Sequence, residues 1–438
     1  MKRNYMGIRR IKYVILALSV VLTACSTSAL QQRIEIVSDS TGSRLLIDGE
    51  PFFIKGMNWD YFPIGTNWAY SLWQQPDSII QAALDNEMPL LKKMGVNAIR
   101  QYSTIPPCWI QYIYEQYGIY TIINHSFGRY GMTIDNKDYD HTDYCMDNMR
   151  ESLLKEADDL ANTYKDSPGL LLYLIGNENN YGLFWEGAET EDMPASDSVT
   201  CPKLPNDQTT EQQRNARCLY ELMNEATLRI KAIDQSRPVA ICNGDLLFLD
   251  IIVDECKDVD VLGVNSYRGE SFDMLFSDVK RKYGKPVVFT EFGADAYNAV
   301  TQQEAQREQA EILLRNWREI YLNAAGMGHC GNCIGGFTFQ FSDGWWKTGQ
   351  TKNLDTHDTS ASWANGGYRF DYVEGRNNMN EEWFGICAKG LPDSLGLYQL
   401  YPRMAYKVLS DAHKIDPYHA TISTIEQQFN EIESKIEQ

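Results

Sequence analysis

Short apolar runs alternate with long amphipathic stretches through most of this 438-residue chain, and that alternation limits the fold more than any other feature. The apolar runs have the length of strands, and the stretches between them repeat apolar residues at helical spacing. A strand, a helix and another strand form the unit from which parallel sheets are built. We therefore expect strands at 52–56, 98–101, 119–124, 170–176, 239–243, 261–265, 287–290 and 336–340.

Helices are expected between these strands. The clearest helical patterns cover 79–94, 107–117, 144–164, 211–233, 271–283 and 302–324, and a weaker pattern covers 246–255. Strands and helices in this regular alternation predict an α/β fold that closes into a (β/α)8 TIM barrel. A doubly wound open sheet is the alternative, but no glycine-rich phosphate loop follows the first strand.

The barrel occupies residues 34–415 in this interpretation. Residues 33–37 and 44–47 alternate on either side of turn residues 38–43, which predicts an N-terminal β-hairpin. Two long segments, 185–214 and 342–397, follow the fourth and eighth strands, so we expect both over the catalytic face of the barrel. Residues 416–438 are expected to form a C-terminal helical tail.

The first 24 residues have the pattern of a secretion signal. They carry five basic residues and no acidic one. The apolar stretch from Tyr13 to Leu22, which follows the basic residues, is too short for a permanent transmembrane helix. The stretch ends in Leu22-Thr23-Ala24-Cys25, which resembles the bacterial lipobox. The resemblance implies cleavage before Cys25, lipid attachment to that cysteine, a tether over 25–33, and anchoring in the bacterial cell envelope on its periplasmic or cell-surface face. An ordinary secretory peptide with a chance cysteine is the alternative.

Composition narrows the classes of function. The net charge of −19 repels nucleic acid, and the basic residues form no stripe along which a phosphate backbone could bind. Ten tryptophans and 26 tyrosines exceed the needs of the core, so we expect some to line a cleft and stack on a flat ligand. Cys330 and Cys333 form the one CxxC pair, which argues against zinc and leaves a structural disulfide or two plain thiols.

Two predicted strands end in a glutamate, and these residues carry the functional prediction. The fourth strand runs into Asn177-Glu178, and the seventh runs into Thr290-Glu291. Because the carboxyl ends of barrel strands meet at one face, both carboxylates are expected at the mouth of the barrel. A single carboxylate at a strand end is more often part of an ion pair, whereas the paired arrangement favours catalysis.

Retaining cleavage of a glycoside uses two carboxyl groups roughly 5–5.5 Å apart. One stays protonated and assists the leaving oxygen, and the other is ionised and attacks the anomeric carbon. We assign Glu178 as the general acid/base and Glu291 as the nucleophile. Burial and like-charge repulsion are expected to separate their proton affinities. This reaction requires no metal and no organic cofactor.

These motifs resemble the clan A glycoside hydrolases, barrels with an acid/base after strand 4 and a nucleophile after strand 7. The resemblance implies that Asn177 binds the sugar 2-hydroxyl, that Arg100 keeps the nucleophile ionised, and that Tyr267 hydrogen-bonds it. Each of these residues also has a plainer interpretation as a packed or hydrogen-bonded structural group. The other substrate-binding candidates are His125 after strand 3, Asn265 at the end of strand 6, and Trp345 or Trp346 after strand 8.

Within this clan the chain is similar to two families. Residues 45–58 and the segment that begins at Glu291 resemble the TIM-barrel domain of glycoside hydrolase family 2. Residues 88–100 and 118–123 resemble the family 72 β-1,3-glucanosyltransferases. The two resemblances imply the same double-displacement chemistry and leave the substrate open.

The combined pattern predicts a retaining β-glycoside hydrolase or transglycosylase that acts on a β-linked oligo- or polysaccharide, with β-glucan as the expected polymer. A lipid-anchored glycan-binding protein whose barrel no longer cleaves is the alternative. The intact Asn177-Glu178 pair and Glu291 favour the enzyme. The expected partners are a carbohydrate substrate and a membrane lipid.

Overall fold

A closed barrel of parallel strands forms the centre of the protein. The computed structural model describes residues 32–183, 209–349, 351–360 and 379–436. Around the barrel the strands follow one another in the order β4, β5, β6, β9, β10, β11, β12 and β15, which is also their order in the sequence. The predicted TIM barrel is therefore confirmed. These strands span Ile54–Asn58, Ala98–Tyr102, Tyr120–His125, Leu170–Ile175, Val239–Gly244, Val261–Asn265, Val287–Phe292 and Cys333–Thr338.

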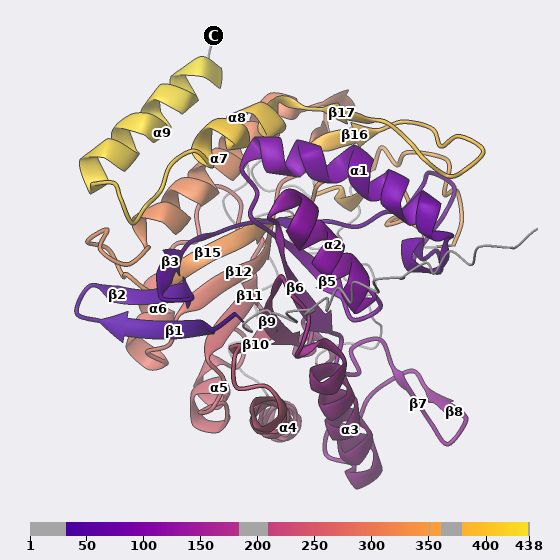
Figure 1. Ribbon diagram of the computed structural model, residues 1–438, viewed down its shortest axis with the longest axis vertical. Helices are drawn as coiled ribbons and strands as arrows, with labels where there is room; N and C mark the ends of the chain where they lie inside the picture. The colour runs from indigo at the N-terminus through magenta and orange to yellow at the C-terminus, as the bar shows by residue number, and fades with distance from the viewer. Residues whose placement is uncertain (1–31, 184–208, 350, 361–378, 437–438) are drawn as a thin grey trace, which may run out of the picture. The chain divides into compact units, whose positions relative to one another are not determined.

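Helices surround the barrel, and each of the first seven follows a barrel strand (Figure 1). Local signals set their limits. Gly95, whose φ of 91° is left-handed, caps the carboxyl end of α1, and Thr209 caps the start of α4 with a capping box to Gln212. The helices span Asp77–Met94 (α1), Pro107–Tyr117 (α2), Asp147–Tyr164 (α3), Thr210–Ile233 (α4), Leu249–Glu255 (α5), Leu275–Lys282 (α6), Gln306–Leu322 (α7) and Met404–Ala412 (α8).

A small antiparallel sheet covers the amino-terminal end of the barrel strands. The predicted hairpin is present as β1 (Ile34–Asp39) and β2 (Gly42–Ile47), and a third strand, β3 (Glu50–Phe52), pairs with β2. Because β3 takes up Phe52, the first barrel strand begins at Ile54, two residues later than its predicted start. Ile34 and Leu45 of this sheet are buried in the same cluster as the side chains that fill the barrel.

The loops at the opposite, carboxyl-terminal end carry most of the irregular structure. They include the short 3-10 helices η2 (Tyr181–Leu183) and η4 (Glu381–Trp383). They also hold the hairpins β7–β8 (Met132–Ile134 and Lys137–Tyr139) and β13–β14 (Tyr297–Asn298 and Gln303–Glu304). The sheet of β16 (Cys387–Lys389) and β17 (Leu400–Pro402) precedes α8. Residues 184–208, 350 and 361–378, which belong to the two long predicted segments, lie outside the described residues.

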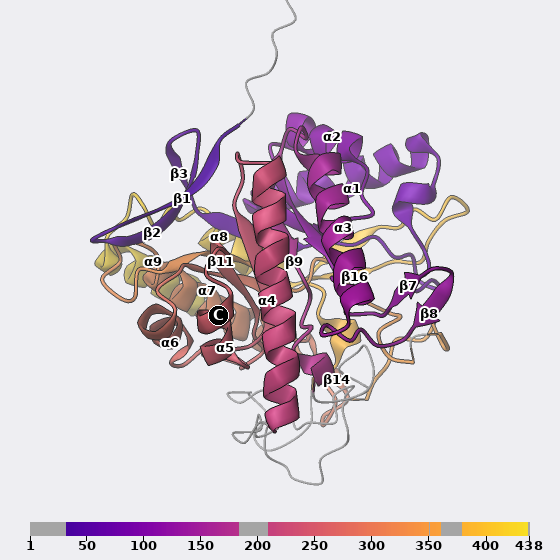
Figure 2. The same ribbon diagram turned by 90° about the horizontal axis from the view of Figure 1, so that it is seen from below.

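A disulfide between Cys145 and Cys218 joins the segment before α3 to α4. Figure 2 shows these two helices side by side, and Arg229 on α4 also pairs with Asp158 on α3. Cys330 and Cys333 are free thiols. Of the two alternatives for this pair, two plain thiols are therefore confirmed and a structural disulfide is wrong.

The last described helix, α9 (Ile422–Ile436), packs on α7 through Ile425, Phe429 and Ile432. In the part of the chain that is described, no helix has the length and apolar character needed to cross a membrane. The predicted signal at 1–24, Cys25 and the tether up to residue 31 lie outside the described residues.

Candidate active site

Glu291 lies near the end of β12 and receives one hydrogen-bond donor on each carboxylate oxygen. The Arg100 guanidinium, from β5, donates to Oε1, and the Tyr267 hydroxyl donates to Oε2 at 2.9 Å. The Glu291 side chain is 12% exposed, so it is largely desolvated without being sealed. The guanidinium and the hydroxyl together satisfy both carboxylate oxygens and fix the orientation of the side chain. The structure therefore brings together three residues that the sequence analysis selected separately.

Arg100 is fixed by a second set of bonds, to three asparagine side chains. Its Nε donates to Asn124 at 2.9 Å, one terminal nitrogen donates to Asn58 at 3.2 Å, and the other donates to Asn177 at 2.7 Å. The strand positions of Asn58 and Asn124 could have been recognised, because each is an amide at the end of an otherwise apolar strand. Neither asparagine was among the predicted site residues.

Glu178 lies three residues after β9 and shares a network with Asn177 and Asn265. The Asn265 amide nitrogen lies 3.1 Å from both Glu178 Oε1 and Asn177 Oδ1. Burial and then the charge of Glu291 raise the pKa of Glu178 to about 8, although Arg129 and Arg100 pull it down. Glu178 is therefore mostly protonated at neutral pH, as a general acid must be. Asn177 Oδ1 accepts from both Asn265 and Arg100, so side-chain hydrogen bonds connect Glu178 to the donor of Glu291.

The backbone of Glu178 has a left-handed conformation, which sets the direction of its side chain. Its φ of 56° is left-handed, a conformation that costs energy in a residue other than glycine. The Asn180 side chain exchanges two hydrogen bonds with Gly244, at 2.8 and 2.9 Å, and the Glu178 amide donates to the Cys242 carbonyl at 3.1 Å. The Asn179 side chain accepts from the Asn177 amide at 2.8 Å. These bonds hold the turn, and the sequence analysis missed them, although two asparagines directly follow the glutamate.

Cys242, two residues before the end of β10, lies beneath this network. Its Sγ is 3.2 Å from the Thr290 hydroxyl and 3.3 Å from the side-chain oxygen Oδ1 of Asn265. Burial raises the pKa of this thiol to about 12, so the thiol stays neutral. Cys242 was not selected from the sequence, where a single cysteine in an apolar strand carries no functional signal.

His125 ends β6, but its hydrogen bonds point away from both glutamates. Its Nδ1 accepts from the Phe127 amide at 3.1 Å, and its Nε2 lies 3.3 Å from a carboxylate oxygen of Glu156 on α3. Burial lowers the pKa of His125 to about 4, so the ring is neutral. Its role in binding a substrate stays a prediction.

The two tryptophans after β15 take different positions. Trp345 stacks on His357 at 4.4 Å, and Trp346 is 8% exposed and packs against Phe62 at 5.5 Å. Phe339, which directly follows β15, and Phe384 make ring contacts to the site, since their centroids lie 6.2 and 5.6 Å from that of Tyr267. A substrate contact by either tryptophan stays a prediction, and Phe339 is an additional candidate that the sequence analysis missed.

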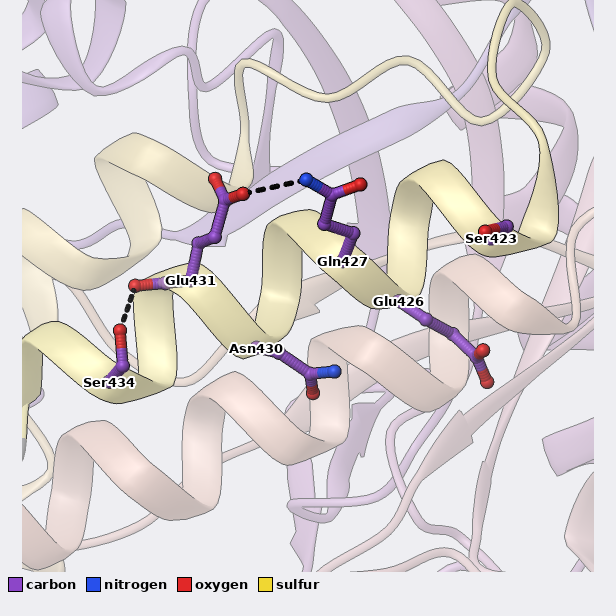
Figure 3. Close-up of a pocket in the computed structure, with 6 residues that line it drawn as sticks. All are labelled: Ser423, Glu426, Gln427, Asn430, Glu431 and Ser434. Atoms are coloured by element: carbon purple, nitrogen blue, oxygen red, sulfur yellow. Dashed lines mark hydrogen bonds between the residues drawn. The ribbon is translucent and has the colours of Figure 1, made fainter.

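Elsewhere on the surface, a shallow hollow runs along α9 (Figure 3). Its lining side chains, among them Glu426, Asn430 and Ser434, all belong to that one helix, and a single helix cannot enclose a ligand. Within the described ranges, no group of three or more histidine, cysteine or acidic side chains is placed to hold a metal ion. The network around Glu178 and Glu291 is therefore the candidate active site.

Comparison with known proteins points to one family. The model of "Glycosyl hydrolases family 2, TIM barrel domain" matches residues 40–324. No curated protein sequence matches the chain. Among solved structures, Bacteroides uniformis β-glucuronidase 2 aligns with a TM-score of 0.53 and 12% identity over 87% of this chain and 37% of its own.

Two further structures align to the same extent of this chain. Bifidobacterium dentium β-glucuronidase gives a TM-score of 0.51 and 19% identity over 87% of this chain and 49% of its own. The β-galacturonidase of Eisenbergiella tayi gives a TM-score of 0.50 and 17% identity over 87% of this chain and 54% of its own. At these identities the similarity shows the fold alone, and the chain spans roughly half or less of the length of these structures.

Proposed function

Because the chain belongs to the glycosyl hydrolases of family 2, we propose that it is a retaining β-glycoside hydrolase with Glu178 as general acid/base and Glu291 as nucleophile. One observation supports this assignment above all. A carboxylate paired with Arg100 and Tyr267 stands near a carboxyl group whose pKa is raised to about 8. Two carboxyl groups with opposite protonation states are what double displacement needs.

In the first step, an ionised Glu291 oxygen attacks the anomeric carbon while protonated Glu178 gives its proton to the glycosidic oxygen. The leaving sugar departs as an alcohol, and a covalent glycosyl ester forms on Glu291. The negative charge of Glu291 then disappears, so the pKa of Glu178 falls and this carboxylate becomes able to act as a base.

In the second step, ionised Glu178 removes a proton from water or from an acceptor sugar, whose oxygen attacks the anomeric carbon. The ester bond to Glu291 breaks and both glutamates return to their starting states. Water as acceptor gives hydrolysis, and a sugar gives transglycosylation. We keep both outcomes in the proposal, with a β-linked glycan and in particular a β-glucan as substrate.

The experiment that tests this assignment uses a β-glycoside with an activated leaving group. Glu291→Ala is expected to abolish turnover, and added azide is expected to restore it with inverted product, because the small anion occupies the space of the missing carboxylate. Tandem mass spectrometry of the wild-type protein with a slow fluorosugar substrate should place the covalent sugar on Glu291. Near-normal activity of Glu291→Ala would contradict the proposal.

The alternative is a glycan-binding protein with an inactive barrel. It predicts saturable binding of β-glucan oligosaccharides with no product and no covalent adduct. Calorimetry and product analysis on the same preparation separate the two functions. The paired donors on Glu291 favour the enzyme, because a binding protein has no need to keep that carboxylate ionised.

We also propose that Cys25 carries a lipid that anchors the protein in the bacterial cell envelope. The support is the sequence Leu22-Thr23-Ala24-Cys25 after an apolar stretch. Labelling of growing cells with a fatty-acid analogue is expected to mark the wild-type protein but not Cys25→Ala. Equal labelling of both would contradict lipidation at this position.

A further inference from the structure

We propose that the Thr290 hydroxyl is a positioning group for the acid/base: it holds the Asn265 amide with its nitrogen toward Glu178, so that the proton of Glu178 sits on Oε2. This inference rests on the proposed function and deepens it, because it names the residue that prepares the acid and the oxygen atom that gives up the proton.

The orientation of the Asn265 amide follows from Arg100. A guanidinium can only donate, so Asn177 Oδ1, which lies 2.7 Å from a terminal nitrogen of Arg100, is an acceptor. The Asn177 nitrogen turns the other way and donates to the Tyr130 hydroxyl at 2.8 Å. The Asn265 atom that lies 3.1 Å from Asn177 Oδ1 is consequently a donor, which is the amide nitrogen Nδ2. The amide oxygen of Asn265 therefore points away from Asn177.

Two donors from the neighbouring strands hold that amide oxygen. Asn265 ends β11, and Thr290 and Cys242 lie on β12 and β10, which pair with β11 on either side. The Thr290 hydroxyl donates to Asn265 Oδ1 at 2.7 Å, and the neutral Cys242 thiol donates to the same atom at 3.3 Å. All three residues are 2% exposed or less, so water does not readily replace either donor. The two donors therefore set the direction of the amide.

Thr290 is itself fixed through its backbone. Its carbonyl oxygen accepts from the Asn58 amide nitrogen at 3.0 Å, and the Asn58 side-chain oxygen accepts from Arg100 at 3.2 Å. Arg100 in turn donates to Glu291, the residue that follows Thr290 in β12. The strand that carries the nucleophile thus also carries the group that orients the amide beside the acid.

The second hydrogen of the Asn265 amide decides where Glu178 is protonated. One hydrogen of Nδ2 faces Asn177 Oδ1, and the other faces Glu178 Oε1 at 3.1 Å. In a carboxylic acid the carbonyl oxygen is a better acceptor than the hydroxyl oxygen. Oε1 is therefore the carbonyl oxygen, and Oε2 carries the proton that the glycosidic oxygen receives.

The first test is Thr290→Val, which removes the hydroxyl and keeps the shape of the side chain. The Asn265 amide then loses the closer of its two anchors, and its bond to Glu178 weakens. That bond lowers the pKa of Glu178, so the alkaline limb of kcat/KM is expected to move upward by about half a pH unit or more. We also expect kcat to fall about tenfold with KM little changed, because the acid is less well aimed. Thr290→Ser keeps a hydroxyl and should restore both values.

Thr227→Val is the matched control, because it removes another buried hydroxyl, which donates to the Met223 carbonyl at 2.8 Å within α4. The control should leave the alkaline limb in place. A folded Thr290→Val protein with an unmoved limb, or a shift that Thr290→Ser shares, would overturn the inference and leave the proposed function intact. A wild-type protein that neither cleaves a β-glycoside nor forms the adduct on Glu291 would instead reject the proposed function, and the role of Thr290 with it.

A measurement on the wild-type protein covers the case in which Thr290→Val does not fold. Neutron diffraction from deuterium-exchanged crystals, grown at neutral pH or below, locates the exchanged hydrogens directly. We expect deuterium on Glu178 Oε2, none on Oε1, and two deuterium atoms on the Asn265 atom that faces Glu178. Deuterium on Oε1, or an Asn265 oxygen turned toward Glu178, would overturn the inference without any turnover experiment.

Discussion

The two ends of the barrel each contain a buried arginine–carboxylate pair, and the pairs differ in how completely they are satisfied. At the amino-terminal end, Asp234 accepts from Arg237 at 3.0 Å, from Tyr173 at 2.8 Å and from the hydroxyl and amide of Ser236 at 2.6 and 2.9 Å. The Arg237 guanidinium also donates to backbone carbonyls of the preceding segment. The side chains of this pair are 2% and 1% exposed.

At the carboxyl-terminal end, Glu291 has two donors and a side chain that is 12% exposed, and a second carboxyl group stands near it. Glu178 is there held protonated by burial and by like charge. A pair that serves stability is closed on all sides, whereas the pair at the candidate site keeps one direction open and tolerates a like charge. This contrast predicts where mutations affect activity and where they affect folding.

The largest effect after loss of the nucleophile is expected from Glu178→Gln. It removes the proton donor, so kcat/KM for a substrate with a poor leaving group should fall about 10²- to 10⁴-fold. For the wild-type protein, kcat/KM should fall as the pH rises through about 8, because the required proton leaves Glu178 there. The variant should lose this alkaline limb. An unchanged pH–rate profile in the variant would show that another group supplies the proton.

The two arginines give a direct test of the contrast between the ends. Arg237→Met leaves the buried Asp234 without its cation and should lower the free energy of unfolding by about 3–5 kcal/mol. Where the variant remains folded, its kcat should change little. Arg100→Met should reduce kcat about 10²- to 10³-fold, because the nucleophile loses its charged donor. Urea unfolding and steady-state kinetics on both variants check the prediction, and equal effects of the two on kcat would break the comparison.

A smaller effect is expected from Asn180→Ala, which deletes the two hydrogen bonds to Gly244. The turn that aims Glu178 should loosen, and kcat should fall about tenfold with an unfolding free energy lower by about 1–2 kcal/mol. Asn224→Ala is the matched control, because Asn224 exchanges two hydrogen bonds with Asp258 near the amino-terminal end of the barrel. If both variants lower kcat equally, the turn has no special role in positioning the acid/base.

Most of the barrel could be predicted because its strands are buried on both faces and therefore read as continuous apolar runs. The predicted sixth strand matches β11 at both ends. The eighth strand was the least well placed, since β15 begins at Cys333, three residues before the predicted start. Gly335 and Gly336 explain this difference: they weaken the pattern, yet Gly335 is needed where its α-carbon approaches the backbone of Ile54.

The members of the site could be predicted in part, because strand ends place side chains at a known face of a barrel. This reasoning selected Glu291, and the resemblance to the clan A glycoside hydrolases added Arg100 and Tyr267. The structure places the three side chains in contact. The strand-end pattern does not predict the direction of a side chain that lies beyond the end of its strand. His125 therefore bonds to Glu156 on a neighbouring helix, and Phe339 rather than a tryptophan touches Tyr267. Such details depend on loops whose packing has no periodic signal.

The bridge between Cys145 and Cys218 spans a sequence separation of 73 residues, and Glu178 lies within this covalent ring. By loop-closure entropy, such a bridge stabilises the native state by about 4 kcal/mol relative to the open chain. Material produced in a reducing cytoplasm would lose this restraint on the very segment that carries the acid/base. Expression in a reducing host, or treatment with dithiothreitol, is therefore expected to lower the melting temperature of the protein. The highest temperature at which activity can be assayed would fall with it.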